Sequence, residues 1–519
     1  MGRGGPVVTS GARTELSELT HRDAPWAGLR VLVTGIGVSG FAAAAALAER
    51  GAEVLVVDDR DGEAEQDKAR VLELLRARVQ LGAGSTTAPE ILRTLTPDRA
   101  DRVDLVVTSP GWRPTTPVLA AAAANAVPIW GEVELAWRMR AATGAAPWLT
   151  LTGTNGKTTT VTLLASILTA AGRRAIAAGN VGTPILEAVL DPRPYDVIAV
   201  ELSSFQLHWA HSLRPQASAC LNIAPDHLDW HGSLEAYAAD KGRVYANTEI
   251  ACVYNVADPR TESLVEDAEV VEGCRAIGFT LGVPGLSMLG VVDDILCDRA
   301  FVAERRTSAA ELGTLDDVRV ASGGTLAPHS IANALAAAAL ARAHGVPPVA
   351  IRDGLRSYRP QAHRIALVAE AAGVRWVDDS KATNPHAADA ALRAFDSVVW
   401  VAGGLAKGAT FEDLVATHAD RLRAAILLGT DAPLIEQALA RHAPHVPVHT
   451  VRLDQTGQMS AGDATFAAHL MDAVVRRAAD LAQPGDTVLL APACASMDQF
   501  VSYSHRGDAF ADAVRRRVG

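Results

Sequence analysis

The sequence predicts an α/β protein made of three tandem α/β domains, with a Rossmann-like N-terminal domain, a central P-loop domain and a Rossmann-like C-terminal domain. Three observations predict it. Apolar, strand-like runs alternate with helical stretches along the chain, which is typical of parallel sheets covered by helices. Two Gly-rich loops each follow such a run and open a helix. The length of 519 residues is more than a single domain usually holds.

The N-terminal domain begins with a βαβ unit. A buried strand at 29–34 leads into the loop Gly35-Ile-Gly-Val-Ser-Gly40, an Ala-rich helix ends near residue 50, and a second strand covers 52–57. Asp58 and Asp59 follow, and either stands where a ribose-binding carboxylate is expected. The loop alone leaves NAD(P), another nucleotide or a purely structural turn open. Further strands of this domain are expected at 103–108 and 127–130.

The central domain carries the more specific loop. The run Thr152-Gly-Thr-Asn-Gly-Lys-Thr-Thr-Thr160 lies between a strand at 148–152 and a helix at 157–171, so amides, a lysine and hydroxyls converge on phosphates and Mg²⁺. It departs from the general P-loop pattern, since Leu151 stands where the leading Gly is expected. Strands at 197–201 and 219–223 then end in polar loops.

Carboxylate and imidazole groups follow these two strands. Glu201 ends the first, and the run Asn222-Ile-Ala-Pro-Asp-His227 follows the second. Beside a P-loop, such groups suit Mg²⁺ coordination. We expect His231 to be structural. The acidic stretch 258–324 has few clear periods and could hold short antiparallel strands.

Lysine is rare in this chain, which has only Lys68, Lys157, Lys241, Lys381 and Lys407 among 48 basic residues. A chain so biased toward arginine should keep lysine mainly where phosphate needs a compact charge or where an amine must react. Lys241 is the exception, because its helical context favours an exposed surface lysine.

The C-terminal domain repeats the strand-loop pattern after helices at 330–343 and 350–357. Strands are expected at 375–377, 397–402, 424–428 and 486–491. The loops with Lys381, Lys407 and Ser496 each follow one of them and could share one sheet edge. Two amines beside hydroxyls indicate a site for a carboxylate-bearing substrate.

Composition excludes several classes. The formal charge is −11, which argues against a nucleic-acid or anionic-membrane binder. The five cysteines are widely spaced, without a Cys-x-x-Cys pair, which indicates reduced thiols. No apolar stretch reaches the roughly 20 residues that span a bilayer. We therefore expect a cytoplasmic monomer with no nucleic acid and no membrane insertion.

Domain boundaries follow from these patterns. Residues 1–27 are polar and lack the apolar core of a secretion signal, so we expect a disordered tail there. The domains are expected at 28–130, 131–359 and 360–519.

With these residues in view, the chain from about residue 28 to 519 resembles the Mur ligases. The P-loop, Glu201 and the run 222–227 are shared by that family. The runs Asp378-Asp-Ser-Lys-Ala-Thr-Asn384 and Pro492-Ala-Cys-Ala-Ser-Met-Asp-Gln-Phe500 resemble the branch that adds D-glutamate to UDP-N-acetylmuramoyl-L-alanine. No Asp-Asn-Pro-Arg run, expected of the diaminopimelate or lysine adder, occurs.

The resemblance implies an ATP-dependent amide-forming ligase with a site for each substrate. It implies that the first Gly-rich loop binds a UDP-sugar, not NAD, and that Asn180 contacts substrate beside the P-loop. The UDP-sugar positions are Gly37, Val38, Ser39, Asp58, Arg60, Ser109 and Gly111. The ATP positions are Gly153, Thr154, Asn155, Gly156, Lys157, Thr158, Thr159, Asn333, Arg364 and Asp379. The D-glutamate positions are Lys381, Thr383, Lys407, Ser496 and Tyr503.

The resemblance also implies two Mg²⁺ ions. Thr158 and Glu201 match ligands of one, and His227 and a CO₂-derived carbamate on Lys241 attend the other. Lys241 is therefore recast from a surface residue to a functional one, and only an amine, not arginine, can take up CO₂. Tyr503 is a departure, because the family more often has Phe there.

Three alternatives remain open from the sequence. Another Mur ligase or a folylpolyglutamate-type ligase would share the central domain but use a different amino acid. A nicotinamide-dependent dehydrogenase would rest on the first Gly-rich loop alone. A non-catalytic nucleotide-binding scaffold would bind ATP and release no phosphate.

Overall fold

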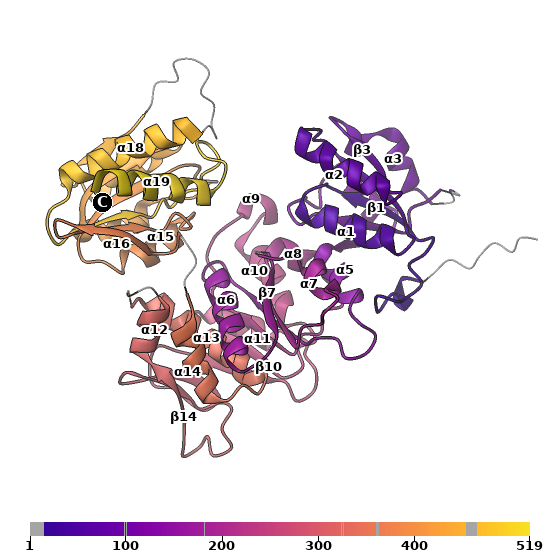
Figure 1. The fold of residues 1–519 in the computed structure, drawn as a ribbon, viewed down its shortest axis with the longest axis horizontal. Coiled ribbons are helices and arrows are strands. Elements are labelled where there is room, and N and C mark those ends of the chain that lie inside the picture. The colour runs from indigo at the N-terminus through magenta and orange to yellow at the C-terminus, as the bar shows by residue number, and fades with distance from the viewer. Residues whose placement is uncertain are drawn as a thin grey trace, which may run out of the picture. The chain divides into compact units, whose positions relative to one another are not determined.

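A computed structural model describes residues 15–97, 99, 101–180, 182–322, 324, 326–359, 363–452 and 464–518. The predicted α/β class is confirmed, because three sheets dominated by parallel strands alternate with helices along the chain (Figure 1). The chain forms two compact units, one of residues 1–150 and 174–215 and the other of 151–173 and 216–519.

The first sheet is five-stranded and wholly parallel, with the order β3-β2-β1-β4-β5. Because β1 lies between β2 and β4, the order reverses at β1. Open α/β sheets commonly bind ligands at such a reversal, between the loops that follow the two strands, here β1 and β4. The strands are β1 (Arg30–Thr34), β2 (Glu53–Asp58), β3 (Arg78–Leu81), β4 (Leu105–Thr108) and β5 (Ile129–Gly131), and the helices are α1 (Val38–Glu49), α2 (Glu63–Leu74), α3 (Pro89–Thr94), α4 (Pro117–Ala124) and α5 (Glu132–Arg138).

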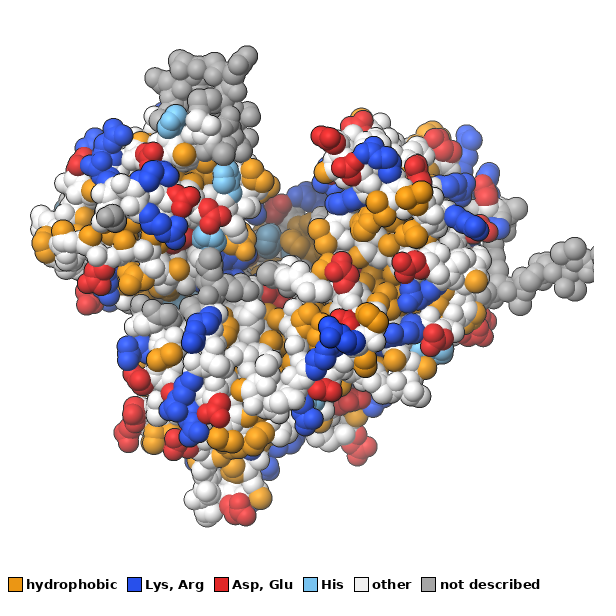
Figure 2. Space-filling view, viewed as in Figure 1, with side chains coloured by type: hydrophobic (Ala, Val, Ile, Leu, Met, Phe, Trp, Pro, Cys, Tyr) orange, Lys and Arg blue, Asp and Glu red, His pale blue; other side chains and the backbone are white. Residues whose placement is uncertain are grey.

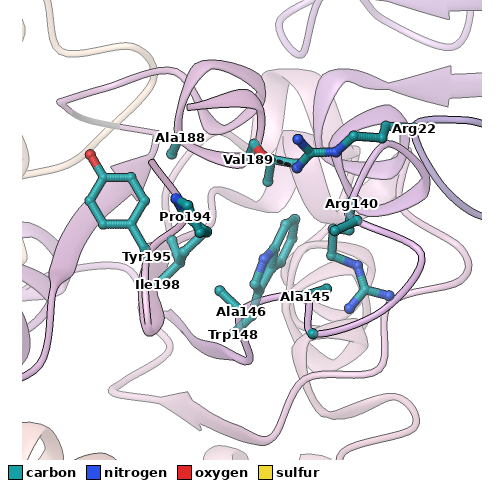
Figure 3. Close-up of a pocket in the computed structure, with 12 residues that line it drawn as sticks. Arg22, Arg140, Ala145, Ala146, Trp148, Ala188, Val189, Pro194, Tyr195 and Ile198 are labelled. Carbon is teal, nitrogen blue, oxygen red and sulfur yellow. Dashed lines mark hydrogen bonds between the residues drawn. The ribbon is translucent and has the colours of Figure 1, made fainter. Parts of the chain in front are cut away.

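The described part of the expected tail, residues 15–27, is folded and not disordered; residues 1–14 lie outside the described residues. Leu19 and Trp26 are buried, and Trp26 Nε1 donates to His21 O. Arg22 donates to Val189 O at 2.7 Å, beside a pocket of about 40 Å³ (Figure 3). Leu19 and Trp26 anchor this segment. Because the rest of the segment is polar, its composition alone does not predict that it folds.

The second sheet is nine-stranded, with the order β14-β13-β12-β11-β10-β9-β6-β8-β7. Strands β9 to β12 pair in parallel, whereas β12, β13 and β14 form the antiparallel strands expected within 258–324. The boundary between the two compact units falls inside β6. The strands are β6 (Trp148–Thr152), β7 (Ala175–Gly179), β8 (Val197–Glu201), β9 (Ala217–Cys220), β10 (Ala251–Asn255), β11 (Arg275–Phe279), β12 (Met288–Val292), β13 (Ile295–Asp298) and β14 (Ala310–Thr314).

Short helices connect most strands of this second sheet. The two longest are α6, which opens at the P-loop, and the Ala-rich α13, which is buried at 333–341 and 343. The helices are α6 (Lys157–Ala170), α7 (Ile185–Leu190), α8 (Ser204–His208), α9 (Leu228–His231), α10 (Leu234–Gly242), α11 (Pro259–Glu266), α12 (Leu315–Ala321), α13 (Pro328–Ala343) and α14 (Pro348–Ser357).

The third sheet is six-stranded, with the order β15-β16-β20-β17-β18-β19, and only β15 is antiparallel. Alternate residues of β17 point to opposite faces: Trp400 packs in one core cluster with residues of α15, α16 and α17, and Val401 in another with residues of α18 and α19. Figure 1 shows α18 and α19 on one side of this domain and α15 and α16 on the other. The strands are β15 (Ala366–Ala371), β16 (Val374–Asp378), β17 (Val398–Gly403), β18 (Leu422–Leu428), β19 (Val448–Thr450) and β20 (Thr487–Leu490), and the helices are α15 (Pro385–Leu392), α16 (Glu412–His418), α17 (Ala432–His442), α18 (Ala464–Leu481) and α19 (Tyr503–Val518).

The surface carries both signs of charge. On the face drawn in Figure 2, basic and acidic side chains are interspersed between apolar ones. Within the described residues, no helix combines the length and the hydropathy that crossing a bilayer requires.

Candidate functional site

The first Gly-rich loop leaves β1 where the strand order reverses. Gly35 has a φ of +90°, and a Cβ on it would lie 2.6 Å from Ser109 Oγ, so the turn accepts only glycine. A Cβ on Gly40 would lie 1.8 Å from Gly35 O, which is why α1 can start so close to the strand. Val38 is 66% exposed and Gly37 has open space around it. The start of α1 is therefore accessible to a phosphate.

Asp58, at the end of β2, organises this loop. Its carboxylate accepts hydrogen bonds from Ile36 N at 2.9 Å, from Arg60 N at 3.0 Å and from Arg60 Nη2 at 2.9 Å. Burial raises the pKa of Asp58, but the hydrogen bonds outweigh burial and hold the pKa below its usual value. The ionised carboxylate thus orders the loop, and Arg60 keeps most of its side chain in solvent. Ser39 lies on α1 in the same region, and Gly111 follows Ser109 after β4.

The P-loop connects β6 to α6, and the segment after β9 holds it in shape. Thr154 N donates to Asn222 O, Asn155 N donates to Asn222 Oδ1, and Asn222 Nδ2 donates back to Asn155 O, at 2.9 to 3.1 Å. Thr154 Oγ1 also accepts from Ala224 N at 2.9 Å. These bonds satisfy backbone groups that a loop leaves without regular partners.

Two of the five lysines meet at this loop. Lys157 Nζ donates to Gly153 O at 2.7 Å, and Lys241 Nζ donates to the same oxygen at 2.8 Å. Lys241 lies on α10, is 1% exposed and sits 4.7 Å above the Tyr237 ring. The surface position that helical context favoured for Lys241 is wrong, and the functional position implied by the resemblance stays a prediction.

Gly156 lets the Asn333 side chain approach the start of α6. Gly156 has a φ of +82°, and a Cβ there would lie 2.4 Å from Asn333 Oδ1 of α13. Asn333 therefore lies against the P-loop, where the sequence analysis places an ATP contact. Thr158 is buried and Thr159 half-buried in the first turn of α6.

Glu201 ends β8, and its two carboxylate oxygens differ in their hydrogen bonding. Asn180 Nδ2 donates to Glu201 Oε1 at 2.9 Å. Glu201 is 1% exposed, and Oε2 is buried without a hydrogen-bond partner among the described residues. A buried carboxylate oxygen without a donor is costly unless a cation reaches it, so this oxygen fits a Mg²⁺ ligand.

His227 follows β9 in a left-handed conformation with a φ of +53°. Burial lowers its pKa, and the Asp226 carboxylate, 3.6 Å from His227 Nε2, opposes the shift. A neutral imidazole keeps a lone pair for a ligand. His231 instead pairs with Asp240, with 3.0 Å between Nδ1 and Oδ2, and its structural role stays a prediction.

The described residues contain no cluster of three or more His, Cys, Asp and Glu that could hold a metal ion by itself. Magnesium in phosphate chemistry commonly uses one or two protein ligands and completes its shell with substrate phosphates and water. Each of the ligands that the resemblance implies, Thr158, Glu201 and His227, is of a residue type that suits that mode.

In the third sheet, the three strand-end loops with Lys381, Lys407 and Ser496 follow β16, β17 and β20, which are neighbours in the strand order. Leu405 and Ala495 exchange two backbone hydrogen bonds of 2.9 Å, and Ala493 N donates to Ala382 O at 2.9 Å. The predicted sharing of one sheet edge is confirmed. Thr383 N donates to Lys381 O in the first of these loops.

Lys381 and Tyr503 lie together: Lys381 Nζ is 3.9 Å from the centre of the Tyr503 ring. The attraction between an ammonium and a ring face holds a flexible lysine in place. Since the ring and not the hydroxyl makes this contact, the departure from Phe leaves it intact. Lys407 has a φ of +51° and is exposed.

Arg506 of α19 is buried and ties these loops together. Arg506 Nη2 donates to Ser380 O at 2.9 Å and to Cys494 O at 3.2 Å, and Nε donates to Ser380 Oγ at 3.0 Å. Burial lowers its pKa to about 10. The sequence analysis missed Arg506, because one arginine among dozens carries no signal; the neighbouring Gly507, whose Cβ would lie 2.2 Å from His363 Nδ1, could have marked a crowded helix.

Asp379 follows β16 and accepts a hydrogen bond from Ile365 N at 3.3 Å. Burial raises the pKa of Asp379 to about 7, and Arg364 opposes the shift. Arg364 and Asp379, both predicted ATP contacts, are thus electrostatically coupled.

Family comparisons cover all three sheets. The Mur ligase MurD-like N-terminal domain matches residues 29–131, the Mur ligase middle domain matches 151–341, and the Mur ligase glutamate ligase domain matches 363–494. Among solved structures, a pseudomurein peptide ligase type C from Methanothermus fervidus aligns at a TM-score of 0.53 and 17% identity, over 94% of this chain and 99% of that one. At this identity the likeness concerns the fold.

Curated relatives are much closer in sequence. UDP-N-acetylmuramoylalanine–D-glutamate ligase of Streptomyces avermitilis is 59% identical over 94% of this chain and 98% of its own length. The ligase of the same name from Mycolicibacterium smegmatis is 47% identical over 95% of this chain and 97% of its own length.

We expect Arg506→Lys to destabilise the C-terminal sheet by about 3 kcal/mol, because a single ammonium cannot replace the planar fork and leaves buried carbonyls without donors. Hydrogen exchange of the amides in β16, β17 and β20 measures this loss. Arg515→Lys, at an exposed position of the same helix, is the control and should stay within about 0.5 kcal/mol. Equal protection in the two variants would show that Arg506 does not hold the loops.

Proposed function

The chain belongs to the Mur ligase family, and from that premise we propose that it adds D-glutamate to UDP-N-acetylmuramoyl-L-alanine with ATP, in the cytoplasmic stage of peptidoglycan synthesis. The observation that carries this proposal is the 59% identity, over 94% of the chain, to a ligase of that name. Three features of the fold support it. They are the exposed Gly-rich loop after β1, where the strand order reverses, the P-loop, and the strand-end loops of the third sheet that carry Lys381 and Lys407.

The reaction proceeds through an acyl phosphate. A carboxylate oxygen of the muramoyl-L-alanine attacks the γ-phosphorus of ATP, and the bond to the β,γ-bridging oxygen breaks to give ADP. The D-glutamate nitrogen then attacks the acyl carbon, and the tetrahedral intermediate expels phosphate to leave the amide. Nearly all reactants are anionic, so positioning and local cations supply most of the rate.

The ATP phosphates bind at the start of α6. Gly153, Thr154, Asn155, Gly156 and Thr159 line the loop, in which Asn222 holds the amides of Thr154 and Asn155. Lys157 exchanges its contact with Gly153 O for the γ-phosphate. Asn333, beside Gly156, and the coupled Arg364 and Asp379 contact the rest of the nucleotide, with Asp379 at the ribose hydroxyls.

Two Mg²⁺ sites complete the ATP site, with Thr158 and Glu201 at the first and His227 and Lys241 at the second. The unpartnered Glu201 Oε2 supports the first assignment. Bound magnesium would neutralise negative charge that develops on the transferring phosphoryl group.

Lys241 carries a carbamate formed from CO₂. Its burial and the oxygen that it shares with Lys157 support this, because two ammonium groups bound to one carbonyl oxygen repel each other. Carbamylation replaces one of the positive charges with a negative one and provides an oxygen ligand for a cation.

The UDP-sugar binds along the loops after β1, β2 and β4. The open start of α1, at Gly37, Val38 and Ser39, faces the diphosphate, and Arg60 and the Ser109–Gly111 loop flank it. Asn180 contacts the acyl end and also orients Glu201.

D-Glutamate binds at the strand-end loops of the third sheet. Lys381 and Lys407 hold its carboxylates, Thr383 and Ser496 donate hydrogen bonds, and Tyr503 keeps Lys381 in place.

Phosphate release from ATP tests this function. With Mg²⁺ present, we expect release only when both UDP-N-acetylmuramoyl-L-alanine and D-glutamate are added, and not with L-glutamate, diaminopimelate or NADH. Phosphate release with a different amino acid would assign the enzyme to another branch of the family. ATP binding without any release would favour the scaffold, and NADH binding without release the dehydrogenase.

Substitutions of Tyr503 test the D-glutamate site. Tyr503→Phe keeps the ring under Lys381, so its KM for D-glutamate should stay within about twofold of wild type. Tyr503→Leu removes the ring, and we expect KM for D-glutamate to rise about tenfold while KM for ATP is unchanged. The same KM in both variants would remove Tyr503 from the site.

A further inference from the structure

Two cysteines outside the proposed active site lie in contact. Cys252 is on β10 and Cys274 directly precedes β11, and their Sγ atoms are 3.8 Å apart. In the parallel pairing of these strands, Cys252 lies opposite Ala276. Cys274 is two residues before Ala276, so both thiols point to the same face of the sheet.

The two thiols differ in exposure. Cys252 is 2% exposed within the sheet, whereas Cys274 is half-buried. Cys274 lies outside the regular pairing, at the end of a turn in which its amide donates to Val271 O at 3.0 Å. A disulfide requires about 2.05 Å between the sulfurs, and movement of this turn can supply the approach.

The two thiols also differ in acidity. The hydrogen bond with Cys252 lowers the pKa of Cys274, and the same contact, with burial, raises the pKa of Cys252. The thiolate is the nucleophile in oxidation, so Cys274 reacts first and Cys252 resolves.

We propose that Cys252 and Cys274 are a redox-modification site that forms a reversible disulfide with hydrogen peroxide as oxidant. The Cys274 thiolate attacks one peroxide oxygen, the O–O bond breaks, and the departing hydroxide takes a proton to give water. Cys252 sulfur then attacks the Cys274 sulfenic acid, the S–S bond forms, and the hydroxyl leaves as a second water with the proton of Cys252. The two thiols lose two electrons and peroxide gains two.

The disulfide links the start of β10 to the start of β11 and encloses α11. The opposite end of β10 supports the proposed ATP site, because Asn255 Nδ2 donates to Leu221 O at 3.0 Å. The linkage therefore lies at the far end of the strand from that site. We expect phosphate release to change less than about twofold and the unfolding midpoint to rise by a few degrees, since the cross-link restricts the unfolded chain.

Thiol counting after peroxide treatment of the full chain tests the proposal without relying on the ligase activity. The denatured wild type should show five free thiols before treatment and three after it, with five restored by dithiothreitol. Peptide mapping without reductant should show one linked pair that joins the segments around Cys252 and Cys274.

Three variants separate this pair from general oxidation. Cys274→Ser should keep its four thiols, and Cys252→Ser should lose one thiol and carry a sulfenic acid that dimedone traps at Cys274. Cys297→Ser is the matched control, because Cys297 is also half-buried but burial raises its pKa; this variant should still form the linked pair. Peroxide oxidation of Cys297 without a 252–274 link, or an equal rate of thiol loss in Cys274→Ser and wild type, would overturn the proposal.

Discussion

The exchange of hydrogen bonds between the P-loop and the segment after β9 is the constraint on which the central site depends. Asn222 accepts from the amides of Thr154 and Asn155 and donates back to the Asn155 carbonyl group, so a Gly-containing loop is held in one shape before any phosphate binds. The same segment runs on to His227, and α10 follows with Lys241. One short stretch of chain therefore shapes the phosphate cradle and places the two side chains assigned to the second cation.

A second buried hub serves the third sheet. The guanidinium of Arg506 alone donates hydrogen bonds that would otherwise need several separate donors. It joins the loops after β16 and β20, which carry Lys381 and Ser496. The planar guanidinium of Arg506 suits several fixed oxygens inside the fold, whereas a lysine ammonium is a compact charge of the kind that the proposed phosphate and carboxylate contacts need. In a chain with a net charge of −11, cations placed in this way act individually.

Much of this architecture could be predicted from the sequence. Buried parallel strands are apolar runs, and both Gly-rich loops are recognisable from the spacing of their glycines between a strand and a helix. Short strands such as β3 and β7 were missed, since Arg78–Leu81 and Ala175–Gly179 carry few β-branched residues. The burial of Lys241 and of Arg506 is set by tertiary packing, which local periodicity does not report. Leu19 and Trp26 fold a polar segment for the same reason.

We propose that position 241 requires an amine and not merely a positive charge. Phosphate release by Lys241→Arg, with both substrates and with the unfolding midpoint measured alongside, tests this most directly. Lys68→Arg is the control, because Lys68 donates to Ile36 O in the loop after β1 and lies outside the P-loop. We expect at least about a hundredfold loss of turnover in a folded Lys241→Arg protein. Wild-type turnover in that variant would contradict it.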